Sequence, residues 1–199
     1  MKHVLQKIVE DHSVEARWLN TLSLLEHTGA RKICKTVGLD HPSLEILEHF
    51  ADETRHALSF RRLSLSLSDS TSDQYLCHDE ATSYFQMLDH TVSESLRAAT
   101  ERDDAYQNYL FVTNMIEKRA MKLYPLYRSV TENRLVKDEL QKIIVEETSH
   151  LQWIEKKTAG ILKEFSLGDI SPFLKIEESF YQAFEESLAK AVKPFQSRP

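Results

Sequence analysis

The chain has 199 residues, a formal net charge of -6, four glycines and five prolines. This length fits one domain with a substantial core. The few glycines and prolines argue against a strand-and-turn fold, and the acidic balance argues against a nucleic-acid binder, which needs a clustered basic face. We therefore predict a single all-α domain over residues 1–199.

The beginning of the chain predicts neither an export signal nor a membrane anchor. Lys7, Glu10 and Asp11 fall where a signal peptide needs its apolar segment, and no later stretch reaches the roughly 18 uncharged apolar residues of a membrane span. We expect a soluble, cytoplasmic protein with no membrane partner. Cys34 and Cys77 form no CxxC pattern, so we expect two reduced, partly buried thiols.

Apolar residues at helical spacing predict a first long helix that begins near Ser13. It is expected to end near Val37, because Gly38 is a typical residue after a helix. The segment 40–43 then contains Asp, His, Pro and Ser, which favours the start of a new helix.

The second predicted helix begins near Leu44 and runs to about Arg62 or slightly beyond. It is followed at 63–68 by alternating Leu and Ser residues, a pattern that also suits a short strand. Because no strand partner is evident, we interpret this segment as the fraying end of the helix. The polar residues 68–74 are predicted to form a linker.

The second half of the chain predicts four further helices. An amphipathic stretch at about 79–100 is expected to be an accessory helix in the crossover connection. The third bundle helix is expected over 103–128, with Pro125 kinking or ending its last turn, and the fourth over 133–162. A final apolar stripe predicts a C-terminal helix at 171–192, which packs on its own bundle or, as the alternative, on a partner.

The pattern acid-Glu-Thr-x-His occurs twice, once in the second and once in the fourth predicted helix. It places Glu53 three residues before His56 and Glu147 three residues before His150. Residues three apart share one face of a helix, so each pair can bind one metal ion. About one Glu-x-x-His pair is expected by chance in this composition, so the weight comes from what accompanies them.

Counting back from each interhelical loop identifies the carboxylates at the same level. The first loop lies near residue 39 or 40, so Glu53 is level with Glu26; the second lies near residue 132, so Glu147 is level with Glu117. Glu15 lies about three turns too far from the loop. Four buried carboxylates would repel one another, and two divalent cations would neutralise them.

On these residues, the segment 13–162 resembles the ferritin-like di-iron carboxylate superfamily, which includes rubrerythrins, bacterioferritins, ribonucleotide reductase small subunits and several oxygenases. The resemblance implies a four-helix bundle with an accessory helix between its second and third helices and an extra C-terminal helix. In that family Glu53 and Glu147 would bridge the metals. The implied metal ligands are Glu26, Glu53, His56, Glu117, Glu147 and His150.

The resemblance also implies two iron ions, with Mn/Fe and Mn/Mn as alternatives, since these centres share the ligand set. The first hypothesis is an oxidase or oxygenase that activates dioxygen or peroxide to oxidise a small organic substrate. The second is a ferroxidase or iron-handling protein, and the third a metal-stabilised scaffold that binds a partner.

With only two cysteines, no rubredoxin-type relay is present, so we expect an external electron donor. A homodimer is left open.

Several residues near the predicted ligands are given structural roles. Asp52 and Glu146 are expected to face solvent or the helix edge rather than to bond the ligand imidazoles. His27, His90 and the remaining histidines match no ligand position. Three tyrosines of the third bundle helix are expected to be core residues rather than redox-active phenols: Tyr106, Tyr109 and Tyr124.

Overall fold

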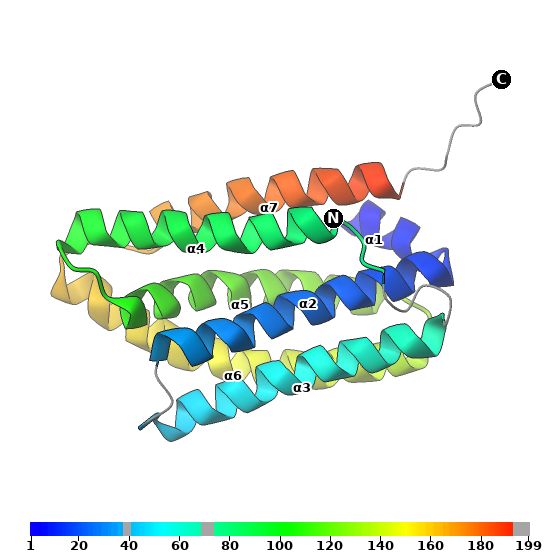
Figure 1. Cartoon of the computed structure of the whole chain (residues 1–199), viewed down its shortest axis with the longest axis horizontal. Helices are drawn as coiled ribbons and strands as arrows, with labels where there is room; N and C mark the ends of the chain where they lie inside the picture. Colours follow the sequence, from blue (N-terminus) through cyan, green and yellow to red (C-terminus); the bar gives the residue numbers. More distant parts are fainter. Residues whose placement is uncertain (38–40, 69–73, 193–199) are drawn as a thin grey trace.

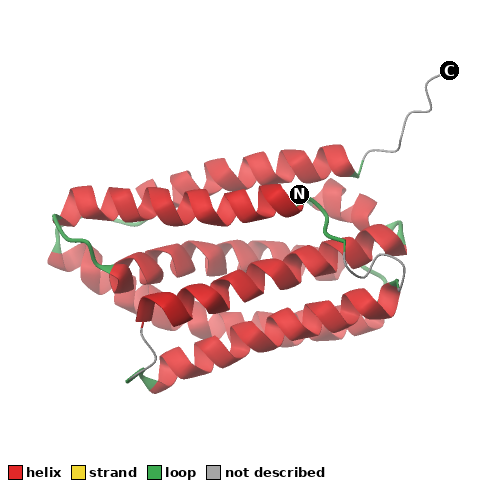
Figure 2. Cartoon of the chain, in the orientation of Figure 1, coloured by secondary structure: helices red, strands yellow, loops and turns green. Residues whose placement is uncertain are grey.

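A computed structural model of the chain describes residues 1–37, 41–68 and 74–192, and all regular structure in these ranges is helical (Figure 2). The all-α prediction is therefore confirmed. Within these ranges no helix combines the length and the apolar character that crossing a membrane requires. The helices are α1 Lys2–Val9, α2 His12–Val37, α3 Leu44–Leu67, α4 His78–Thr100, α5 Ala105–Val130, α6 Arg134–Glu164 and α7 Ser171–Ala191.

Four of the helices pack side by side as a bundle (Figure 1). Helix α2 lies along α3, and α5 lies along α6; the two hairpins meet through contacts of α2 with α5 and of α3 with α6. Among the described residues, the backbones of the diagonal pairs α2 with α6 and α3 with α5 stay more than 8 Å apart between Cα atoms. Side chains from all four helices can therefore meet along the axis between them.

Helices α4 and α7 form a second layer over one side of this bundle. They lie side by side in Figure 1, α4 contacts α2 and α5, and α7 contacts α5. The apolar stripe of α7 is buried at Phe173, Tyr181, Phe184 and Leu188, so it packs on its own chain. In the described part of the chain α3 and α6 contact no helix outside the bundle. The bundle thus has one covered side and one open side.

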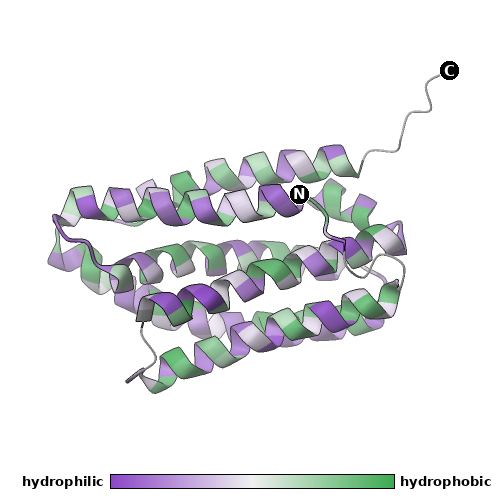
Figure 3. Ribbon diagram, viewed as in Figure 1, coloured by the Kyte–Doolittle hydropathy of each residue, from purple (hydrophilic) through white to green (hydrophobic). Residues whose placement is uncertain are grey.

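The sequence pattern and the helix caps explain where the helices lie. Figure 3 shows polar and apolar residues mixed along every helix, as expected for helices with one buried stripe. The side chain of Asp104 accepts hydrogen bonds from the backbone N–H groups of residues 106 and 107. Asn133 does the same for residues 135 and 136. These two caps fix the starts of α5 and α6.

The structure differs from the sequence-based predictions in three helices. Helix α1 was not predicted; its Val4, Leu5 and Ile8 are buried, and it packs on α2, α5 and α7. Helix α3 extends to Leu67, so the Leu-Ser segment is a regular part of the helix. Helix α5 does not end at Pro125 but continues to Val130.

Burial explains why α5 continues past its proline. The proline ring removes one backbone hydrogen bond, but Leu123, Tyr124 and Tyr127 around it are buried and hold this turn in the core. The predicted stop at Gly38 and Asp40 and most of the predicted linker, 69–73, lie outside the described residues.

Candidate metal centre

The six side chains proposed from the sequence converge in the middle of the bundle. Their oxygen and nitrogen atoms belong to three overlapping groups, in each of which the ligand atoms lie within 4.8 Å of one another. Two members, Glu117 and Glu147, are shared between groups. All six are buried except His150, whose side chain is 11% exposed. The converging residues are Glu26 from α2, Glu53 and His56 from α3, Glu117 from α5, and Glu147 and His150 from α6.

Glu147 lies between the two predicted imidazole ligands. Its Oε1 is 3.0 Å from Nδ1 of His56 on α3, and its Oε2 is 3.0 Å from Nδ1 of His150 on its own helix. One carboxylate therefore presents each of its oxygens to a different imidazole. This is the arrangement that a carboxylate needs to bridge two ions.

A seventh residue, His49, belongs to the same cluster, which corrects the prediction that no other histidine occupies a ligand position. Its Nε2 is 3.1 Å from Oε1 of Glu53 and 3.1 Å from Oε1 of Glu117. The His49 and His150 rings lie 4.5 Å apart. The sequence contained a usable signal, because His49, Glu53 and His56 follow at i, i+4 and i+7 and so share one helical face.

The acidic residues before the two ligand glutamates also contact the cluster, and the prediction that they avoid the ligand imidazoles is wrong. Glu146 Oε2 lies 2.8 Å from Nε2 of His56, and Asp52 Oδ2 lies 3.1 Å from Nε2 of His150. Arg55 joins the two carboxylates, at 2.5 Å from Asp52 and 3.0 Å from Glu146. Each carboxylate therefore fixes an imidazole of the opposite helix, which directs its Nδ1 into the cluster.

Two tyrosines of α5 bond members of the cluster. The Tyr124 hydroxyl donates a hydrogen bond to Glu26, and the Tyr109 hydroxyl lies 2.8 Å from Nδ1 of His49. Burial and the charge of Glu26 raise the pKa of Tyr124 well above its usual value. Both phenols are buried, as expected of core residues. Tyr106 packs against the hydrophobic cluster that contains Tyr109, with the two ring centroids 6.1 Å apart.

The electrostatics of the cluster favour bound protons when no cation is present. Burial, together with the charge of Glu53, raises the pKa of Glu26 well above its ordinary value. Burial and the charge of Glu147 do the same to the pKa of Glu117. Burial disfavours a charged His56, but its hydrogen bond to Glu147 and the nearby carboxylates outweigh this and raise its pKa to about 10. A divalent cation would displace these protons.

Two further observations fit a bound cation. Nδ1 of His56 and Oε1 of Glu117 are buried without a well-directed hydrogen bond among the described residues, although Glu147 and His49 lie 3.0 and 3.1 Å from them; a cation would bind both atoms in place of a proton. A Cβ at Gly29 would lie 2.6 Å from Oε2 of Glu53. Glycine at this position leaves room for that carboxylate. The buried Glu and His groups can therefore hold a metal ion.

Glu15 lies outside the cluster, in agreement with its rejection as a ligand. It is 2% exposed, and its carboxylate accepts hydrogen bonds from Tyr127 at 2.9 Å and from Thr131 at 2.8 Å. His27 and His90 also belong to none of the three groups.

The two sides of the cluster open into different environments. Towards the layer of α4 and α7, Glu26 and Glu53 line a cavity of about 60 Å³ whose other walls are mainly apolar, among them Leu22, Leu25 and Phe184. On the open side, between α3 and α6, His49 and His150 line a cleft of about 490 Å³. This cleft is acidic, with Glu45, Glu48, Asp52 and Glu146 around it.

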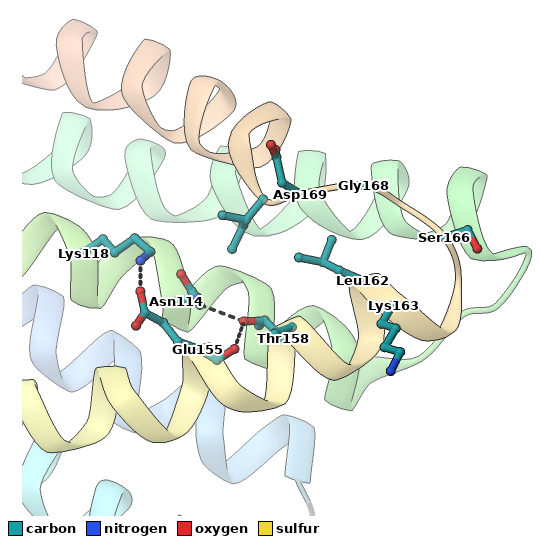
Figure 4. A pocket seen from close by; sticks show the side chains of 11 residues that line it. Asn114, Lys118, Glu155, Thr158, Leu162, Lys163, Ser166, Gly168 and Asp169 are labelled. Atoms are coloured by element: carbon teal, nitrogen blue, oxygen red, sulfur yellow. Dashed lines mark hydrogen bonds and ion pairs between the residues drawn. The ribbon is translucent and has the colours of Figure 1, made fainter.

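Another cleft, of about 540 Å³, lies where α6 leads into α7. Figure 4 shows Lys118 bonded to Glu155 and Asn114 bonded to Thr158 along its floor. None of its lining residues belongs to the three groups of the cluster. The cluster is therefore the candidate functional site, and this cleft lies apart from it.

A scan of protein-family models, a search of curated proteins and a search of solved structures found no match to this chain. Its function is therefore argued from its own residues and their geometry.

Proposed function

We propose that this chain is a ferritin-like di-iron carboxylate protein that uses dioxygen or peroxide to oxidise a small organic substrate. The observation that carries the proposal is the set of carboxylates and imidazoles that four helices bring together around shared Glu117 and Glu147. Carboxylate and imidazole donors suit iron and manganese, so Mn/Fe and Mn/Mn centres are the alternatives to two iron ions.

When bound, an Fe(II) pair would supply electrons to dioxygen or peroxide. The residues of the chain prepare the site for this chemistry. Glu146 and Asp52 hold the imidazoles of His56 and His150 in position, and Tyr124 donates a hydrogen bond to Glu26. The apolar walls of the small cavity beside Glu26 limit the access of water to this side.

The apolar cavity favours substrate oxidation over iron handling, because an organic substrate binds favourably against apolar walls next to the metals. The acidic cleft on the open side favours the alternative, a ferroxidase or iron-handling protein, because acidic residues attract Fe(II). The scaffold hypothesis is weakened, since α7 buries its apolar stripe on its own chain. The expectation that an external donor supplies electrons, and the possibility of a homodimer, stay predictions.

Anaerobic Fe(II) titration followed by exposure to oxygen tests the proposal. We expect two Fe(II) per chain and, after oxygen is admitted, an absorbance change that needs both ions. Glu147→Gln should reduce the bound iron, because Glu147 contacts both imidazoles. Glu94→Gln on α4 is the matched control, since Glu94 is exposed and, within the described ranges, pairs with the exposed Arg97 alone.

The fate of the iron then separates oxidase from ferroxidase. An oxidase keeps two ions per chain through repeated oxygen additions, whereas a ferroxidase releases or accumulates Fe(III) and takes up more Fe(II). A stoichiometry well below two, or no response to oxygen, contradicts the di-iron enzyme.

A further inference from the structure

The cavity beside Glu26 and Glu53 has a second polar wall that the metal centre does not use. Arg119 on α5 and Tyr181 on α7 line the same cavity. Both are largely buried, with 13% of the Arg119 side chain and 4% of Tyr181 exposed. A guanidinium and a phenol among the mainly apolar walls of this cavity call for a specific partner.

Glu177 holds Arg119 in a fixed position. Nε and Nη2 of Arg119 lie 2.9 and 2.7 Å from the two carboxylate oxygens of Glu177, and Nη2 also contacts Glu178 at 2.7 Å. The hydroxyl of Tyr84 donates to the same Glu177 at 2.8 Å. The remaining amino group, Nη1, makes no hydrogen bond or ion pair among the described residues. One donor group of a rigid guanidinium is therefore left for a ligand.

The hydroxyl of Tyr181 is also unsatisfied. It is buried without a hydrogen-bond partner in the described part of the chain, while the Tyr181 ring packs under the Arg119 guanidinium at 3.9 Å. Burying a hydroxyl without a hydrogen-bond partner is unfavourable, because the group loses its hydration and gains nothing in return. A ligand oxygen that accepts from Tyr181 or Arg119 would remove this penalty.

The charges around Arg119 decide which kind of oxygen fits. One positive guanidinium faces two carboxylates, Glu177 and Glu178, so its charge is already balanced. A carboxylate or phosphate ligand would meet no uncompensated positive charge here and would lose its hydration. A neutral oxygen can accept the same hydrogen bonds without this cost.

We propose that this cavity selects a small neutral molecule with a hydrocarbon body and one hydrogen-bonding oxygen, such as a ketone or an alcohol, over an anion of the same shape. The inference names the substrate class of the metal centre and so rests on the proposed function for its biological meaning. The cavity encloses about 60 Å³, far below the roughly 300 Å³ at which sites for drug-sized ligands begin. The part of the molecule that it takes is therefore a few non-hydrogen atoms.

Three probes of one shape test this selection. Butan-2-one carries the neutral oxygen, propanoate replaces the ketone by an anion, and 2-methylbut-1-ene replaces the oxygen by a CH₂ group. Binding is followed by NMR from the methyl signals of Leu22, Leu25 and Leu123, which line the cavity. The protein is loaded with Zn(II), which has no redox chemistry, so the result does not depend on the oxygen reaction.

We expect butan-2-one to bind at least ten-fold more tightly than propanoate and more tightly than the alkene. Tyr181→Phe removes only the hydroxyl and should weaken butan-2-one roughly two- to ten-fold, the effect of one hydrogen bond, without weakening the alkene. Tyr75→Phe is the matched control, because Tyr75 packs on His78 outside the cavity.

Three results would overturn the inference: propanoate binding as tightly as the ketone, an equal loss for ketone and alkene in Tyr181→Phe, or no response of the cavity methyl signals. Because Ala120 also lines the cavity, Ala120→Leu should abolish binding of both neutral probes. If the probes bind as expected but iron-loaded protein does not react with oxygen, the proposed function fails and the ligand selection stands. If iron-loaded protein reacts with oxygen but the binding tests fail, the proposed metal centre stands and only the inferred ligand selection is refuted.

Discussion

The imidazoles of His56 and His150 are each bonded through Nε2 to a carboxylate of the opposite helix. Asp52 on α3 contacts His150 on α6, and Glu146 on α6 contacts His56 on α3. Because Arg55 pairs with both carboxylates, the two supports are linked into one network. A residue adjacent to a ligand glutamate thus acts on the ligand of the opposite helix.

Replacing His49 tests whether it is a metal ligand. His49→Leu removes Nε2 of His49, which lies 3.1 Å from a carboxylate oxygen of both Glu53 and Glu117. We expect the affinity for one of the two ions to fall at least ten-fold, while the other ion is retained. Anaerobic titration with Co(II), read by absorbance and calorimetry, measures both steps. His90→Gln, at an exposed position of α4, should leave both steps unchanged, and two unchanged steps in His49→Leu would contradict the assignment.

The stability of the metal-free protein should fall as the pH rises from about 6.5 to 10. The pKa of His56 is raised to about 10 from 6.5, so its stabilisation is fully present below pH 6.5 and is lost as the pH rises through 10. The raised pKa values of Glu26 and Glu117 act in the same direction. Each proton that only the folded state retains contributes a slope of about 1.4 kcal/mol per pH unit.

Urea unfolding at several pH values measures this slope. Metal-loaded protein should show a weaker fall or a rise over the same range, because cations replace the protons. The pKa of Glu147 is lowered, so its stabilisation is lost only at acid pH, below about 4.5, and does not reverse the slope. Equal slopes for the metal-free and metal-loaded forms would show that protons and metal do not compete.

At the scale of helices, most of the arrangement was accessible from the sequence. Helix periodicity and the two interhelical loops are local features, and counting residues back from each loop put Glu26 and Glu117 beside the paired motifs. In the second hairpin the cap Asn133 supports this counting, because it fixes the first turn of α6 directly after the loop.

Other features depended on contacts between helices and were not accessible in the same way. Helix α1 has only eight residues, and so short a helix is stable only when it packs on others. The roles of Asp52 and Glu146 depend on the rotation of α3 against α6. His49 was a different case, since its spacing to Glu53 was visible but did not match the Glu-x-x-His pattern that was sought.

The caps themselves can be tested through stability. Asn133→Ala removes hydrogen bonds to the backbone N–H groups of residues 135 and 136, and we expect a loss of about 1 kcal/mol. Ser43→Ala is the matched control, because the side chain of Ser43 caps no backbone N–H of α3. Urea unfolding of both variants in the metal-free state measures the difference. A loss for Ser43→Ala as large as for Asn133→Ala would refute the argument from caps.

At the scale of the whole molecule, the cluster lies between two unlike surroundings. The layer of α4 and α7 covers the side of α2 and α5 and encloses the apolar cavity. The side of α3 and α6 carries the acidic cleft. Under the proposed function, a metal ion would approach the cluster from the acidic side and an organic substrate from the apolar side.

Metal binding should also stabilise the whole bundle, because the cluster joins α2, α3, α5 and α6. At a free metal concentration 100 times the dissociation constant, one ion adds about 2.7 kcal/mol to the stability. For a domain of this size that corresponds to a rise in melting temperature of roughly 5–10 °C per ion. Calorimetry of chelator-treated protein before and after Fe(II) is added back without oxygen measures the rise. Glu147→Gln should lose most of this rise in melting temperature, and Glu94→Gln should keep all of it. An equal rise in both variants would place the stabilising metal outside this cluster.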